Sequence, residues 1–233
     1  MKRNILARVV ITLPLSMAPC ARAQMGMDLF KKLTIAKAFH PVVGKGAAYE
    51  STSKQSSGPK TRVMEISIVG KESVEGKEAV WMEFATTDDK GQQLLGKTLM
   101  SLDDFQFHKM IIQMPGGPAL EMPFNPAAAH REKIQENMED WHSVGSGTVT
   151  VPAGTFDCEH CRNDKAKSDA WTTDKVTPFG MVKQVGENRT MVLTKILTDA
   201  PDRITGLVQK FDPATMQPRP LRQTGRAQES WAG

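Results

Sequence analysis

The sequence predicts a fold of the α+β class that is mainly β: a curved antiparallel sheet, or half-open barrel, wrapped around one principal helix. Apolar residues recur at every second position through most of the chain after residue 45, and clusters of Gly, Pro, Ser and Asp separate these runs. Both features are typical of consecutive antiparallel strands. One segment, 127–142, has helical spacing instead. A curved sheet packed around that helix would bury the apolar face of each.

Residues 1–23 have the features of a secretory signal peptide. Lys2 and Arg3 form a basic start, residues 9–19 are largely apolar, and Ala21-Arg22-Ala23 is a small-x-small cleavage site. The apolar run is shorter than the roughly 20 residues that a membrane-spanning helix needs. We therefore expect cleavage after Ala23 and a periplasmic protein with no transmembrane segment. The proline before Cys20 argues against a lipid anchor at that cysteine.

The net charge of +4 also comes from the leader. The chain has 30 Lys and Arg against 26 Asp and Glu, and the first 23 residues hold four of the basic residues and no acidic one. The rest of the chain is therefore formally neutral, which gives no reason to expect nucleic acid as a partner.

The domain is expected to span 24–199. Its clearest element is a hairpin of strands 62–71 and 78–86, joined by Glu75-Gly76-Lys77. A short helix over 27–35 is expected before it. Further strands are expected at 45–54, 97–102, 105–114, 119–124, 147–151, 155–162, 169–173, 180–185 and 189–198. Segment 114–124 could be either a flap or a hairpin connection.

The principal helix is expected over 127–142. Asn125 is a good N-cap, Pro126 suits the first turn, and Ile134, Met138 and Trp141 form one apolar stripe. The C-terminal segment, 200–233, contains four prolines and ends in polar residues. We expect it to be poorly ordered beyond Gln217.

Cys158-Glu159-His160-Cys161 is the most conspicuous motif. In a regular strand these two cysteines point to opposite faces about 10 Å apart, too far for a disulfide. Two ordinary thiols, a local disulfide that bends the strand, and a redox or metal role all remain open. The other histidines form no second cluster at zinc spacing.

No nucleophile motif or phosphate-binding loop appears. The paired carboxylates Asp88-Asp89 and Asp103-Asp104 lie in polar, turn-like sequence. We therefore expect no enzymatic activity, no cofactor, no metal and a monomer.

Methionine is abundant, with 14 residues, and many fall on predicted strands. Flexible thioether side chains adapt to varied apolar ligands, although they also fill ordinary cores. The candidate lining of a hydrophobic cavity is Met64, Ile66, Met82, Phe84, Met110, Ile112, Met138, Trp141 and Trp171.

Two stretches carry a family resemblance. Residues 148–160 read TVTVPAGTFDCEH, and residues 170–182 read AWTTDKVTPFGMV. Over about 148–198 the chain resembles the LolA/LolB-like, or lipoprotein-sorting, superfamily of secreted bacterial proteins. The resemblance implies a half-open barrel closed by helices, whose concave face accepts acyl chains of lipoproteins in the sorting proteins. It carries over no defined set of ligand residues.

The expected function is therefore that of a non-enzymatic envelope protein that binds a lipid, an acyl chain or another hydrophobic ligand. The alternatives are an envelope protein-interaction module with a filled core, and a redox or metal role at Cys158 and Cys161.

Overall fold

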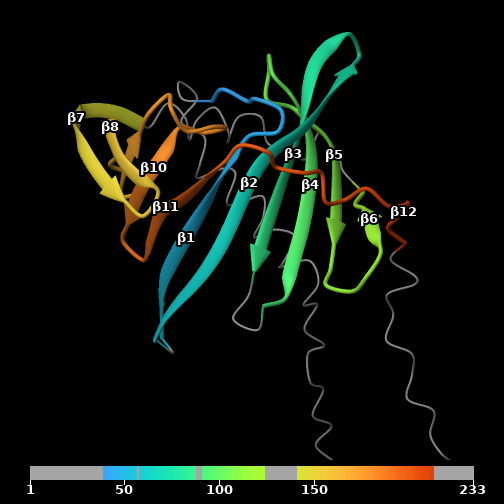
Figure 1. Cartoon of the computed structure of the whole chain (residues 1–233), viewed down its shortest axis with the longest axis horizontal. Helices are drawn as coiled ribbons and strands as arrows, with labels where there is room; N and C mark the ends of the chain where they lie inside the picture. Colours follow the sequence, from blue (N-terminus) through green and yellow to red (C-terminus); the bar gives the residue numbers. More distant parts are fainter. Residues whose placement is uncertain (1–38, 57, 88–90, 124–140, 213–233) are drawn as a thin grey trace, which may run out of the picture.

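A computed structural model describes residues 39–56, 58–87, 91–123 and 141–212, and these form one twelve-stranded sheet (Figure 1). The strands are β1 Gly46–Gln55, β2 Gly58–Val74, β3 Lys77–Thr87, β4 Gln93–Ser101, β5 Phe107–Gln113, β6 Ala119–Glu121, β7 Trp141–Val151, β8 Gly154–Asn163, β9 Ser168–Thr172, β10 Met181–Gly186, β11 Arg189–Leu197 and β12 Val208–Lys210.

The strand order is β12-β6-β5-β4-β3-β2-β1-β11-β10-β9-β8-β7. Neighbours are antiparallel except β12, which pairs in parallel with β6. The predicted hairpin is confirmed as β2 and β3. Apart from β12, chain order is kept within each half of the sheet, and β1 joins the halves by pairing with β11 as well as β2.

The predicted fold class is wrong, because the described residues form a single open sheet with no helix to wrap around. Most of segment 127–142 lies outside the described residues, as does 27–35. The last two residues assigned to the helix, Trp141 and His142, begin β7, which continues through Gly145. The residues at the end of the apolar stripe, Trp-His-Ser-Val, are equally compatible with a strand. The spacing of apolar residues therefore does not define where a helix would end and a strand begin.

The two faces of the sheet differ in composition. We call the face that bears Ile66 the inner face; by register it also carries Phe84, Gly96 and Ile112 on the three following strands. The main core lies against it, and the largest fully buried side chains include Tyr49, Phe179 and Ile66. The outer face carries buried polar residues such as Glu83 and Lys97.

Residues 200–207 form a segment that we call the strap. It follows β11, an interior strand, and crosses the sheet to reach β12 at one edge (Figure 1). Ile204 packs with Ile111 and Ala119 in a second small core. β12 was not expected from sequence, because its three residues carry no recognisable period. No helix in the described part of the chain is long and apolar enough to cross a membrane.

Candidate functional site

Most of the predicted cavity lining lies on one face. Met64, Ile66, Met82, Phe84, Met110 and Ile112 share the inner face by register. All but Ile112 are buried, with exposed fractions of 0–6%. Alternation alone therefore predicted that these six residues of β2, β3 and β5 share one face.

The remaining three predicted lining residues do not join that group. Met138 lies outside the described residues. Trp141 packs with Cys161 and Ala170 in a separate small cluster. Trp171 pairs with Lys183 of β10. Its ring packs against the edge of the main core and stays partly exposed.

Several core residues were missed by the sequence analysis. Tyr49 of β1 is 1% exposed and its hydroxyl donates to the carbonyl of Met181 at 3.1 Å. Burial raises the pKa of Tyr49 well above its ordinary value, so the phenol stays protonated. Met191 and Leu193 of β11 also face the core. β1 and β11 were predicted as strands, but sequence alone could not show that they pair.

Three phenylalanines, Phe39, Phe105 and Phe179, pack against the core from loops, and we call them the phenylalanine cap. The Phe39 ring centroid lies 5.6 Å from that of Phe105 in an edge-on arrangement and 5.2 Å from that of Phe179. Such contacts add about 0.5–1.5 kcal/mol each to the effect of burial. The backbone amide of His40 also donates to the carbonyl of Pro178 at 2.9 Å.

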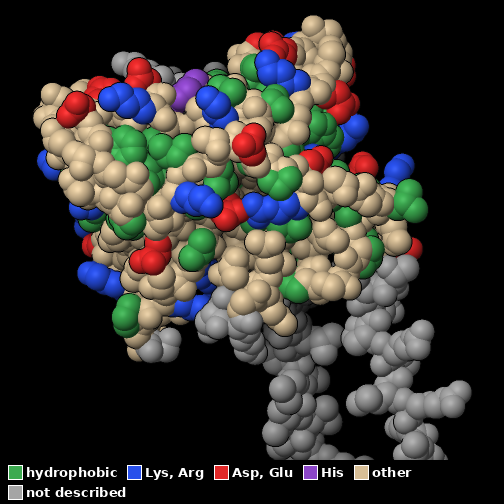
Figure 2. All heavy atoms as spheres, viewed as in Figure 1, with side chains coloured by type: hydrophobic (Ala, Val, Ile, Leu, Met, Phe, Trp, Pro, Cys, Tyr) green, Lys and Arg blue, Asp and Glu red, His purple; other side chains and the backbone are tan. Residues whose placement is uncertain are grey.

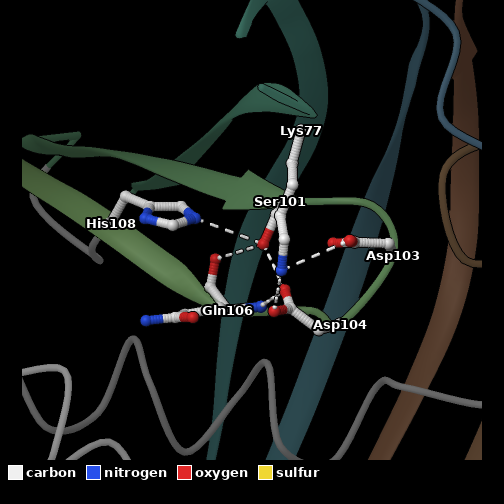
Figure 3. Close-up of polar contacts among 6 residues, drawn as sticks. All are labelled: Lys77, Ser101, Asp103, Asp104, Gln106 and His108. Carbon is white, nitrogen blue, oxygen red and sulfur yellow. Dashed lines mark hydrogen bonds and ion pairs between the residues drawn. The ribbon is translucent and has the colours of Figure 1, made fainter. Parts of the chain in front are cut away.

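Phe105 is held in a backbone conformation that bulky residues avoid. Its φ of 52° lies in the left-handed region, which costs roughly 1–2 kcal/mol in a residue with a Cβ. The neighbours of Phe105 on both sides belong to a polar network at the β4–β5 turn (Figure 3). The amide of Gln106 donates to Asp104 Oδ1 at 3.1 Å, and the amide of Ser101 donates to the carbonyl of Gln106 at 3.0 Å. These bonds fix the turn that presents the Phe105 ring.

The same network contains a serine, a histidine and an aspartate, but not in a catalytic arrangement. His108 Nε2 lies 3.2 Å from Ser101 Oγ, while Asp104 bonds Ser101 and Lys77 (Figure 3). In a catalytic triad the aspartate orients the histidine. Ser101 is also 0% exposed, so its hydroxyl cannot reach a substrate. The network is structural.

The charges of this turn fit that role. The hydrogen bond from Ser101, followed by that from Lys77, holds the pKa of Asp104 well below its ordinary value. The hydrogen bonds to Asp104 and Asp103 raise the pKa of Lys77. Both side chains therefore stay charged at neutral pH. The assignment of this acidic pair to a turn is confirmed, because 102–104 form the connection between β4 and β5.

Cys158 and Cys161 of β8 are buried and form no disulfide with each other. Cys158 belongs to the main core and Cys161 to the small cluster with Trp141. Burial, followed by the charge of Asp157, raises the pKa of Cys158. Such a thiol is a poor nucleophile. The strand geometry that separates the two cysteines is as predicted.

His160 takes part in a charged and aromatic ladder across β8, β9 and β10. Its ring stacks on Trp171 at 4.5 Å, and its Nε2 lies 2.7 Å from Asp169 Oδ1, which also accepts from Arg162 Nε at 2.9 Å. Lys183 Nζ lies 5.3 Å from the Trp171 ring centroid. Within the described residues, no three His, Cys, Asp or Glu side chains gather as metal ligands.

Comparisons with known proteins identify no family. No protein-family model and no curated protein matches the chain. Among solved structures, it is similar to a protein described as a lipoprotein from Parabacteroides distasonis (14% identity) and to one described as an exported protein with a YmcC-like fold from Bacteroides fragilis (13% identity). Each likeness covers 68% of this chain and 97% of the other, with a TM-score of 0.32. That score is too low to support an argument, so the LolA/LolB-like resemblance stays a prediction.

Proposed function

We propose that the protein is a non-enzymatic protein of the cell envelope that holds a lipid, an acyl chain or another hydrophobic ligand against the inner face of its sheet. The observation that carries this proposal is the methionine content of that face. By register, the inner face carries Met64, Met82, Met100, Met110 and Met191. Unbranched thioether side chains repack around apolar molecules of different shape at little cost.

The phenylalanine cap is the route by which we expect a ligand to reach the inner face. Phe39, Phe105 and Phe179 lie outside the strands. The rings can therefore part without breaking a strand ladder. The left-handed conformation of Phe105 supports this view, because a strained residue outside regular structure stores energy that favours an alternative position.

The second candidate is an interaction module with a filled core. It is favoured by the near-complete burial of Ile66 and Met82, both 0% exposed. On this account the core side chains only stabilise the fold, and the sheet surface contacts a partner protein.

Uptake of the neutral fluorescent probe N-phenyl-1-naphthylamine separates the two candidates. Met110 is 6% exposed and Met114 is 39% exposed in the turn after β5. The proposal predicts saturable binding that falls several-fold in Met110→Gln and is unchanged in the control Met114→Gln, with both variants shown to be folded by circular dichroism. Absence of probe binding by the wild-type protein would favour the filled core.

A further inference from the structure

The two edges of the sheet differ in length and charge. At one edge, β12 has three residues and carries Lys210. At the other, β7 has 11 residues (Figure 1), and 143–151 include no Lys, Arg, Asp, Glu or Pro. Short edge strands and edge charges are means by which proteins prevent unwanted strand pairing. The β7 edge lacks both, and after a bulge between Ser143 and Gly145 its ladder with β8 is regular.

The outer edge of β7 is open to solvent. Residues 142–148 and Thr150 are exposed, and a Cβ added at Gly147 would meet nothing within 4 Å. In the part of the chain that the structure describes, β7 pairs with β8 alone. Only Val149 and Val151 turn inward, where they pack with the main core. The two valines therefore hold the strand in place while its outer edge stays accessible.

The register with β8 shows which backbone groups of β7 point outward. Val151 and Gly154 flank a two-residue turn and form its closing, hydrogen-bonded pair. Hydrogen-bonded and non-hydrogen-bonded pairs alternate along an antiparallel ladder. The amide and carbonyl groups of Thr150, Thr148 and Ser146 therefore point away from β8, and they have no hydrogen-bond partner within the described residues. Such a row of donors and acceptors fits another extended strand.

We propose that two copies of this chain pair through β7, antiparallel and related by a two-fold axis beside Thr148, so that their sheets become continuous. This arrangement departs from the monomer expected from the sequence, and it does not depend on the proposed function. Thr148 forms a hydrogen-bonded pair with Thr148 of the second copy, and Ser146 of each copy pairs with Thr150 of the other. These three pairs supply about six backbone hydrogen bonds.

The side chains of β7 suit a second copy of the same strand. In this register Val149 of each copy lies opposite Gly147 of the other, where there is open space. Ser146 and Thr150 bring two hydroxyls together across the pair, which favours pairing. The closest acidic residue, Asp157 of β8, pairs with the central threonine of β7. It would lie about 14 Å from its counterpart, or three strand spacings, which is beyond the screening length at physiological salt.

Analytical ultracentrifugation of the purified chain tests the pairing. We expect the average mass to rise from one chain towards two between about 1 μM and about 200 μM. Thr148→Lys places two ammonium groups directly opposite each other and should weaken association at least tenfold. The control is Thr155→Lys on β8, which changes an exposed threonine of the same face that contacts Thr150, and it should associate as the wild type does. Circular dichroism shows whether each variant is folded.

Disulfide trapping tests the register. Thr148→Cys should give a disulfide-linked dimer on air oxidation, because the Cα atoms of a hydrogen-bonded pair lie about 5.5 Å apart, within reach of a disulfide. Thr155→Cys should remain a single chain. Equal crosslinking of the two variants, or association that Thr148→Lys leaves unchanged, would overturn the proposal. A wild-type chain that stays single at every concentration would overturn it as well, and slow amide exchange at Thr148 in that single chain would show that another segment of the same chain covers the edge.

Discussion

The ring of Phe84 on β3 lies directly over Gly96, its cross-strand partner on β4. A Cβ at Gly96 would overlap three ring atoms of Phe84. Glycine is therefore required at this point of the inner face, because a side chain here would occupy the space taken by the end of the Phe84 ring. The sequence shows a glycine inside a strand, but only the register shows which ring needs it.

We expect Gly96→Ala to lower the free energy of unfolding by about 1–3 kcal/mol, because the Phe84 ring must leave its position in a packed core. Gly147→Ala on β7 is the matched control: it meets nothing within 4 Å, and alanine is preferred to glycine inside a strand. Urea denaturation measures both. Equal stability of the two variants would show that Phe84 does not occupy this place.

The strap is held to the outer face by charges. Glu83 is 1% exposed and accepts a hydrogen bond from the amide of Arg203 at 3.0 Å, and the Arg203 side chain pairs with Glu65. Lys97 pairs with Asp202 and lies 5.0 Å from the centroid of the Trp81 ring. Figure 2 shows acidic and basic side chains interspersed across this face of the molecule, in the same view as Figure 1.

Arg203→Met should destabilise the protein by about 3–5 kcal/mol, because it removes the guanidinium group that lies 3.6 Å from the buried Glu83 carboxylate. The double variant Glu83→Gln with Arg203→Met removes that uncompensated charge and should recover most of the loss. Thermal or urea unfolding of the three proteins provides the test. A loss below about 0.5 kcal/mol in the single variant, as for an exposed ion pair, would contradict this role of Arg203.

Burial raises the pKa of Glu83, and the hydrogen bond and charge of Arg203 offset only part of that effect. A carboxyl whose pKa is raised on folding binds its proton more tightly in the folded state. Protonation of Glu83 therefore increases the free energy of unfolding as the pH falls towards the ordinary pKa of a glutamate. We expect the stability of Glu83→Gln relative to wild type to decline as the pH is lowered from 7 towards 4.5. If the stability of Glu83→Gln relative to wild type increased as the pH was lowered, a raised pKa for Glu83 would be contradicted.

The contribution of Asp104 to stability should have the opposite pH dependence. Its pKa is lowered on folding, so its contribution is complete above its ordinary pKa near 3.8 and is lost as the pH falls below that value. Asp104→Asn should cost about 1–2 kcal/mol at pH 7 and progressively less at pH 3. Because the turn presents Phe105, the variant should also bind N-phenyl-1-naphthylamine faster. A pH-independent difference would show that the carboxylate charge is unimportant.

Alkylation tests the thiols. Cys158 and Cys161 are 3% and 5% exposed and lie on opposite faces of β8. Iodoacetamide should therefore label both only after unfolding, without prior reduction. A peptide that links the two residues in non-reducing mass spectrometry would establish the disulfide instead.

The alternating pattern was sufficient to locate eleven of the twelve strands approximately, and it placed Met64, Ile66, Met82 and Phe84 on one face. The alternating pattern could not predict which distant strands pair. The contact of β1 with β11 joins residues more than 130 positions apart, and nothing local to Tyr49 or Leu193 specifies it. Buried charges were also missed, because Glu83 and Arg203 look like ordinary surface residues until the strap brings them together.

Trp141 shows a different limit. Its spacing from Ile134 and Met138 suits a helical stripe, yet Trp141 begins β7 and pairs with Asn163. Aromatic residues favour strands, and tertiary pairing overrides a short helical period at its end. Segment 114–124, left open between a flap and a connection, contains the short strand β6, which pairs with β5 as a hairpin. The two glycines in its turn permit that reversal, and Gly116 has a positive φ of 70°.

Native mass spectrometry of the exported protein, expressed with its leader and purified from its own cells, tests the central claim most directly. We expect a species heavier than the chain by the mass of one lipid or fatty acid, released on activation and lost from Met110→Gln. A single ligand-free mass for the wild-type protein, together with no uptake of added dodecanoate, would contradict it.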